Sequence, residues 1–132
     1  MTKMIIKDLV TRAPISIDGN SSIVDACRLM KKESVGSLLV LIDSVARGIV
    51  TERDVVYAIA DGVPLTEKVL SIMSSNLVTV DSTTDVSDVA LIMTSRKIRH
   101  LAVVEGGKII GVISLRDVAR ALGLVTADLS VW

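Results

Sequence analysis

The composition of this 132-residue chain excludes several classes of function before any motif is considered. Half of its residues are hydrophobic, yet it contains no Phe, one Trp and one Tyr, so its core must consist of aliphatic side chains and Met. Fifteen Lys and Arg residues balance fifteen Asp and Glu residues, without the basic surplus that is typical of nucleic-acid binders. Nucleic acid is therefore not an expected partner.

The short apolar runs indicate a cytoplasmic protein. Runs such as Ser37 to Asp43 fall well below the roughly 20 apolar residues that a membrane helix needs. The start of the chain, from Met1 to Asp8, lacks the apolar region and the cleavage site of a secretory signal. The single Cys27 lies on an apolar helical stripe, which favours a buried structural thiol. We expect no contact with a membrane.

An internal duplication organises the chain. An offset of 63 positions aligns Leu9 to Ala58 with Ile72 to Ala121 without a gap. The matched positions include a glycine and an Arg-Asp-Val triplet: Gly48 with Gly111, and Arg53-Asp54-Val55 with Arg116-Asp117-Val118. We divide the sequence into a first repeat with the N-terminal segment (1–62), a second repeat (63–123) and a short tail (124–132).

In chain order, each repeat begins with a short strand and an amphipathic helix. Alternating apolar residues predict strands at 15–17 and 78–80. Apolar residues then recur at i, i+3, i+4 and i+7, from Ile23 in the first repeat and from Val86 in the second. This period predicts helices, and Ser22 and Asp85 are the expected N-caps.

A hairpin and a second helix complete each repeat. Paired β-rich runs predict hairpins at 38–42 with 48–50 and at 101–104 with 111–113. The helices that follow, at 53–60 and 116–122, end before Gly62 and Gly123, the residue type expected just past a helix. The order is β-α-β-β-α twice, a mixed α/β (α+β) fold. Because one repeat of about 60 residues would be marginal alone, we expect a face-to-face pseudo-twofold pair with two related clefts.

The sharpest chemical signal is a motif that follows the last strand of each repeat. A glycine and two β-branched residues precede a hydroxyl residue, Thr51 or Ser114, and an aspartate follows three positions later, Asp54 or Asp117. One interpretation is a structural helix cap, with the carboxylate near the positive end of the helix. The other is a ligand site, because a helix N-terminus can receive a phosphate and a carboxylate can accept ribose hydroxyls. The two interpretations are geometrically compatible.

With these features the chain resembles a tandem pair of cystathionine-β-synthase (CBS) domains, an arrangement called a Bateman module. The resemblance covers nearly the whole chain and rests on the doubled fold pattern, the doubled motif and the run Ile98 to Val104. It implies a regulatory protein that binds an adenine nucleotide or adenosyl ligand, namely AMP, ADP, ATP or S-adenosylmethionine, with no catalytic cofactor. Members usually regulate another domain, so a separate protein of unknown identity is the implied target.

The resemblance also implies two ligand sites, each drawing on both repeats. In the family the motif aspartate holds the ribose, the hydroxyl residue approaches the phosphate or ribose, and backbone near the opposite repeat's first strand reads the adenine. The first implied site contains Thr51, Asp54, Asn76, Leu77 and Val78, and the second contains Ser114, Asp117, Ala13, Pro14 and Ile15.

Arg99 and His100 match family positions that often contact phosphates. We expect them to serve the Asp54 site and to give it positive charge, which the matched Gly36 and Ser37 cannot supply to the other site. A lone histidine beside a strand also has a structural interpretation, in which it bonds to nearby backbone.

Catalysis and metal binding are not expected. One His and one Cys, without a cluster at metal-ligand spacing, provide no nucleophile with its base. The alternative function is a ligand-free structural module that dimerises and regulates a partner. The resemblance implies a homodimer in either case, packed through the second helices, whose apolar residues are Val55, Val56, Ile59, Val118, Ala119 and Leu122.

Overall fold

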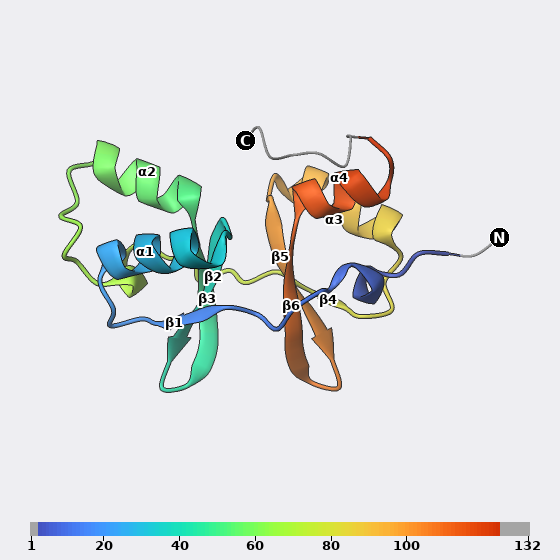
Figure 1. Cartoon of the computed structure of the whole chain (residues 1–132), viewed down its shortest axis with the longest axis horizontal. Helices are drawn as coiled ribbons and strands as arrows, with labels where there is room; N and C mark the ends of the chain where they lie inside the picture. Colours follow the sequence, from blue (N-terminus) through green and yellow to red (C-terminus); the bar gives the residue numbers. More distant parts are fainter. Residues whose placement is uncertain (1–2, 125–132) are drawn as a thin grey trace. The chain divides into compact units, whose positions relative to one another are not determined.

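A computed structural model describes residues 3–124, and these form two compact units (Figure 1). The central unit consists of residues 15–77. The terminal unit combines the N-terminal segment, up to Pro14, with the chain from Val78 onward. Within the described residues, no helix has both the length and the apolar character needed to cross a membrane.

The central unit has one three-stranded sheet, with β2 between β1 and β3. Strand β1 runs parallel to β2, and β2 runs antiparallel to β3, with Ser37 opposite Thr51 at the end where α2 begins. In chain order its elements are β1 (Ser16–Asp18), α1 (Ile23–Glu33), β2 (Ser37–Ile42), β3 (Val45–Thr51), α2 (Glu52–Ala60) and the 3-10 helix η2 (Val69–Ser71).

The terminal unit repeats this arrangement, with β5 between β4 and β6. His100 is opposite Ser114 where α4 begins. Its elements are the 3-10 helix η1 (Ile6–Leu9), β4 (Thr79–Asp81), α3 (Val86–Arg96), β5 (His100–Glu105), β6 (Lys108–Ser114) and α4 (Leu115–Ala121). The predicted order β-α-β-β-α and the mixed α+β class are confirmed.

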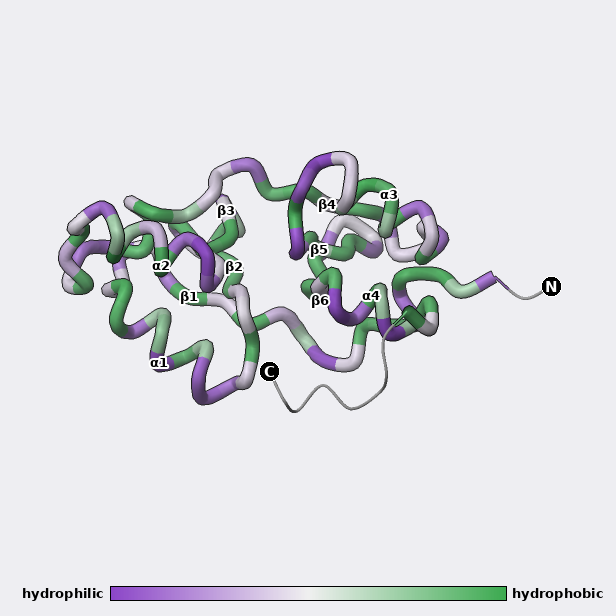
Figure 2. Tube along the Cα trace, turned by 90° about the horizontal axis from the view of Figure 1, so that it is seen from above, coloured by the Kyte–Doolittle hydropathy of each residue, from purple (hydrophilic) through white to green (hydrophobic). Residues whose placement is uncertain are grey.

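The predicted helix ends are also confirmed. The Ser22 side chain accepts a hydrogen bond from the Asp25 N–H at 3.0 Å, and the Asp85 carboxylate accepts one from the Ser87 N–H at 2.9 Å. Gly62 and Gly123 adopt φ of 77° and 73°, the left-handed conformation that ends a helix at little steric cost to glycine. Hydrophobic and hydrophilic residues alternate along α1 in Figure 2, as its amphipathic period requires.

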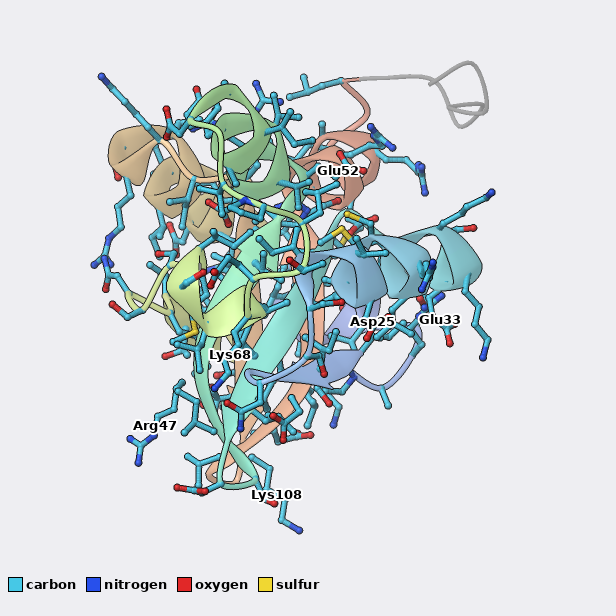
Figure 3. The ribbon with its side chains drawn as sticks, turned by 90° about the vertical axis from the view of Figure 1, so that its left-hand side faces the viewer. Asp25, Glu33, Arg47, Glu52, Lys68 and Lys108 are labelled. Carbon is cyan, nitrogen blue, oxygen red and sulfur yellow. The ribbon has the colours of Figure 1, made fainter. Side chains whose placement is uncertain are left out.

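Each unit has its own aliphatic core. The central core contains Ile17, Ala26, Met30, Leu38, Val40, Val50 and Val69. The terminal core contains Ile6, Val80, Val86, Val89, Met93, Leu101, Val103, Ile113 and Val118. Cys27 is only partly buried, so the expectation of a buried structural thiol was wrong about the extent of its burial. The hairpin side chains Arg47 and Lys108 extend away from these cores in Figure 3.

Two short segments that the periodicity did not predict complete these cores. Ile6 of η1 is fully buried in the terminal unit, and its N–H donates to the Thr84 carbonyl at 2.8 Å. Val69 of η2, the matched residue, is fully buried in the central unit and donates to the Ser21 carbonyl at 2.8 Å. The compact units therefore divide the chain at 14 and 77, whereas the division at 62 describes the repeat pattern and stays a prediction.

We predict that Ile6→Ala lowers the free energy of unfolding by about 2–5 kcal/mol, the usual cost of truncating a buried Ile to Ala. Urea denaturation of the full chain measures this loss. The control is Lys7→Ala, because Lys7 makes only an exposed ion pair with Glu105 and its removal should change stability little. Equal stability of wild type and Ile6→Ala would contradict the assignment of η1 to the terminal core.

Candidate functional site

The glycine of each motif, Gly48 in β3 and Gly111 in β6, allows another segment of the chain to pass close to the strand backbone. In the central unit, Ile49 and Ser74 exchange two backbone hydrogen bonds, at 2.9 and 3.0 Å. A Cβ atom on Gly48 would lie 2.5 Å from the Ser74 carbonyl oxygen, too close for any side chain. The segment that contains the predicted residues Asn76 and Leu77 thereby reaches the unit that holds Asp54, while Val78 belongs to the terminal unit.

The terminal unit has the matching crossing. A Cβ atom on Gly111 would lie 2.7 Å from Val10 Cγ1. Beyond this crossing, a hollow of about 250 Å³ is lined by Leu9, Thr11, Asp117, Arg120 and Ala121. The predicted residues Ala13 and Pro14 therefore lie in the same unit as Asp117. Ile15 belongs to the central unit.

The first motif forms a complete capping box at the start of α2. Asp54 Oδ2 accepts hydrogen bonds from the Thr51 N–H at 2.8 Å and from Thr51 Oγ1 at 3.1 Å. Thr51 Oγ1 in turn accepts from the Asp54 N–H at 3.3 Å. The structural interpretation of the motif is thus confirmed for this helix.

The second motif repeats this geometry at the start of α4. Asp117 Oδ2 accepts from the Ser114 N–H and from Ser114 Oγ, both at 2.9 Å, and Ser114 Oγ accepts from the Asp117 N–H at 3.2 Å. Among residues 3–124, no hydrogen bond reaches Oδ1 of Asp54 or of Asp117. Each carboxylate therefore caps its helix with one oxygen and keeps the other for a further donor.

The backbone at these helix starts is largely bonded already. The Glu52 N–H donates to the Gly36 carbonyl at 3.1 Å, and the Leu115 N–H donates to the Arg99 carbonyl at 2.7 Å. Together with the capped N–H groups of Asp54 and Asp117, two of the first three donors of each helix are occupied. This reduces the capacity of the helix ends to bind a phosphate through backbone alone, so nearby side chains must decide the preference for charge.

His100 lies beside the second motif, opposite Ser114 in the sheet, and is partly buried. Burial lowers its pKa to about 4, and the neighbouring Arg99 and Arg116 also lower the pKa while Asp117 opposes the shift. The imidazole is therefore neutral at pH 7, and the expectation that it adds positive charge was wrong. Arg99 and His100 belong to the terminal unit, together with Asp117. Their predicted role at the Asp54 site stays a prediction.

Glu52 is a charged residue near the first motif that the sequence interpretation passed over. Its carboxylate lies over the backbone of Gly36, so that a Cβ atom there would be 3.2 Å from Glu52 Cδ. The repeat alignment places Leu115 at the matched position of the second motif. Comparison of the two repeats position by position could have found this difference, because the carboxylate directly follows the N-cap threonine.

The doubled fold and the doubled cap define a protein built as a tandem repeat of one small α+β unit. A model of the CBS domain matches residues 6–61 and 69–124. The chain belongs to this family, as a pair of CBS domains, and the resemblance noted in the sequence is confirmed.

Known relatives and solved structures agree with this assignment. An uncharacterized 17.7 kDa protein of Acidianus ambivalens is 37% identical over 120 residues, covering 89% of this chain and 72% of that protein. The CBS domain pair of protein MJ0100, in complex with 5-methylthioadenosine and S-adenosyl-L-methionine, has a TM-score of 0.84 at 25% identity and covers 92% and 98% of the two chains. The CBS domain protein PAE2072 from Pyrobaculum aerophilum, complexed with AMP, has a TM-score of 0.80 at 26% identity and covers 92% and 100%.

We predict that His100 makes stability depend on pH between about 6.5 and 4. The histidine of the unfolded chain gains a proton near pH 6.5, but that of the folded chain gains it only near pH 4. The unfolded state therefore binds more protons in this window, and the free energy of unfolding falls as the pH falls, by at most about 3 kcal/mol.

Urea denaturation at several pH values, for wild type and for His100→Ser, isolates this contribution. Serine is the residue that the first repeat carries at the matched position, Ser37. The difference in unfolding free energy between the two proteins should shrink or reverse as the pH falls from 6.5 to 4. A difference that is constant across this range would contradict the assigned pKa.

Proposed function

We propose that this protein is a regulatory sensor that binds an adenine nucleotide or related adenosyl ligand and does not turn it over. The observation that carries the proposal is the position of Asp117, a residue that lines a hollow and whose Oδ1 keeps accepting capacity. The ribose of such a ligand offers two adjacent hydroxyl donors, which suit a charged acceptor. The matched geometry at Asp54 supports a second site of the same kind.

The hollow has a size and a lining that suit one portion of such a ligand. Its volume of about 250 Å³ is somewhat below the roughly 300–1,000 Å³ of pockets that hold whole drug-sized ligands. A ribose or an adenine ring would fit, with aliphatic contacts from Leu9 and Ala121 and charge from Asp117 and Arg120. As the family resemblance implies, the proposal also includes Ser114, Ala13, Pro14 and Ile15 for the Asp117 site, and Thr51, Asn76, Leu77 and Val78 for the Asp54 site.

The solved CBS pairs support the ligand class. The structure of MJ0100 is a complex with 5-methylthioadenosine and S-adenosyl-L-methionine, and that of PAE2072 is a complex with AMP. These ligands share an adenosyl group and differ in the charge of the substituent at the 5′ carbon. For this chain we propose that the adenosyl group is the common requirement and that AMP, ADP, ATP and S-adenosylmethionine are the candidates. A cytoplasmic location and action on a separate target protein belong to the same proposal.

We predict that Asp117→Asn and Asp54→Asn each remove one adenosine-binding event. Asparagine retains an oxygen that can accept from the N-cap N–H, so the helix should persist, but the ligand loses hydrogen bonds to a charged acceptor. Each such bond is worth about 1.5–3 kcal/mol, so affinity at the altered site should fall roughly tenfold to a hundredfold or more. Isothermal titration calorimetry with adenosine measures both events.

The matched control is Asp25→Asn, which changes an exposed carboxylate at the start of α1. It should leave both binding events unchanged. The wild-type protein is titrated with adenosine, AMP, ADP, ATP and S-adenosylmethionine at millimolar concentration. If none of them gives binding heat or a shift in melting temperature, the result contradicts the proposal and favours the ligand-free structural module. Release of product from ATP would contradict the non-catalytic role.

The alternative function as a dimerising module is favoured by one specific observation, the exposed apolar face of α2. Val56, Tyr57 and Ile59 are 59%, 60% and 56% exposed, a cluster of large apolar side chains on one short helix. Such clusters often mark interaction surfaces. Val55 and Val118, which the sequence analysis included in this surface, are buried in their own units, so that part of the prediction was wrong. We propose that a homodimer packs through α2.

We predict that Val56→Asp combined with Ile59→Asp yields a monomer. A charge on each exposed side chain should prevent burial of the α2 face while leaving the cores intact. Light scattering at micromolar concentration measures the mass of the variant and of wild type. The control is Leu91→Asp on α3, which is 66% exposed outside the proposed surface. A wild-type monomer, or a dimer that survives both substitutions, would contradict the proposal.

A further inference from the structure

We infer that residues 10–12 form a strap that is open in this structure and can close onto the edge of β6. In the closed state Thr11 pairs with Val112 through two backbone hydrogen bonds. The inference comes from a comparison of the two units, because the central unit holds its matched segment in the closed arrangement. It adds a conformational device to the protein and goes beyond the proposed function.

The central unit shows what the closed arrangement looks like. The Ile49 N–H of β3 donates to the Ser74 carbonyl at 3.0 Å, and the Ile49 carbonyl accepts from the Ser74 N–H at 2.9 Å. Both backbone groups of Ile49 therefore point away from β2, and Ile49 is only 7% exposed. The segment that follows η2 is thus held against the edge of the sheet by two hydrogen bonds.

The terminal unit lacks this pairing. Val112 has the same register in β6 as Ile49 has in β3, so its backbone groups also point outward, to the edge where the N-terminal segment crosses β6 (Figure 1). Within residues 3–124, neither of these groups has a hydrogen-bonding partner across that edge. Val112 is also less buried than Ile49. The edge of β6 is therefore unpaired at the position where the edge of β3 is paired.

The side chain that covers the motif glycine explains the difference. A Cβ atom on Gly48 would lie 2.5 Å from the Ser74 carbonyl oxygen and 2.8 Å from Met73 Sδ, so backbone and an unbranched side chain share this space. The three atoms nearest to a Cβ on Gly111 all belong to Val10, with Cγ1 at 2.7 Å and Cγ2 at 3.2 Å. This branched side chain has few rotamers and fills the place that the next carbonyl would need. Val10 therefore keeps the strap off β6.

Closure requires only a small change where the strap leaves η1. The Val10 N–H donates to the Lys7 carbonyl at 3.0 Å, whereas the matched Met73 N–H donates to the Val69 carbonyl at 3.1 Å. Closure would move the Val10 donor from Lys7 to Ile6, the residue matched with Val69, and would add two hydrogen bonds at β6. Because Ile6 is buried in the terminal core, both states share the same anchor. The strap is thus a local two-state element.

Closure would change the wall of the hollow that contains Asp117. Thr11 of the strap lines this hollow together with Asp117 and Arg120. A molecule that contacts Thr11 in its present position would bind the open state better and would shift the strap toward that state. This link to a ligand rests on the proposed function, whereas the strap itself does not.

Amide hydrogen exchange of the full chain, followed by NMR, tests the strap without a ligand. Val10→Met gives the strap the side chain that the central unit has at this position. The strap should then close and slow the exchange of the Val112 amide roughly ten- to a hundredfold, as expected from two backbone hydrogen bonds.

Two further substitutions, made in the Val10→Met background, show whether the strap causes this protection. Thr11→Pro should remove most of it, because proline cannot donate to the Val112 carbonyl. The backbone at position 10 is extended, with ψ of 110°, which suits a following proline. The matched control is Thr11→Ala, which retains the N–H and should keep the protection.

The central unit provides the reciprocal variant. Met73→Val should open the existing pairing and accelerate exchange of the Ile49 amide by a similar factor, roughly ten- to a hundredfold. The amide of Leu101, a fully buried residue of β5, reports global unfolding and serves as the internal reference in every variant.

The outcomes separate the strap from the proposed function. The strap is overturned if Val112 exchanges as fast in Val10→Met as in wild type, or if Thr11→Pro leaves its protection intact. Adenosine should reduce the Val112 protection in Val10→Met. If adenosine binds by calorimetry but leaves this protection unchanged, the link to the hollow is overturned while the strap and the proposed function stand. If adenosine does not bind, the proposed function fails, and the result of the ligand-free experiment still decides the strap.

Discussion

The hydrogen bond from the N-cap N–H to the motif aspartate is the interaction on which each unit's chemistry depends. At Thr51 and at Ser114 it joins the last residue of a strand to the first turn of a helix, at 2.8 and 2.9 Å. The bond orients the carboxylate, because Oδ2 is held by two donors from one residue. The remaining oxygen then points to a fixed position without a separate positioning residue. The structural cap thus leaves one carboxylate oxygen available, which is compatible with the proposed role as a ligand acceptor.

The regular elements could be predicted from the sequence because their signals are local. Helical periods, the N-caps Ser22 and Asp85, and the terminating glycines Gly62 and Gly123 each depend on a few neighbouring residues, and the structure has all of them. The hairpins show the limit of such signals. The strands after the two turns begin at Val45 and Lys108, each three residues before the predicted starts at 48 and 111, although one turn uses Asp43 and Ser44 at positive φ and the other uses two glycines.

The grouping of the chain into units could not be predicted from local patterns. Ile6 and Val69 lie in short 3-10 segments without a periodic stripe, yet both are fully buried. Their partners are residues far away in the sequence, such as Thr84 for the Ile6 N–H. For the site, the motif residues and their spacing were visible, but the charge of His100 was not, because burial determines it and a sequence does not display burial.

The two motif glycines explain how the fold joins the site to the chain's connecting segments. Gly48 and Gly111 have no room for a Cβ atom because Ser74 and Val10 lie against them. Each crossing brings a connecting segment beside the strand that leads into the cap, and in the terminal unit that segment lines the hollow with Asp117. A ligand in such a hollow would contact a connecting segment as well as a helix. Because η1 is anchored in the core through Ile6, binding there would stabilise the packing of the N-terminal segment by mass action.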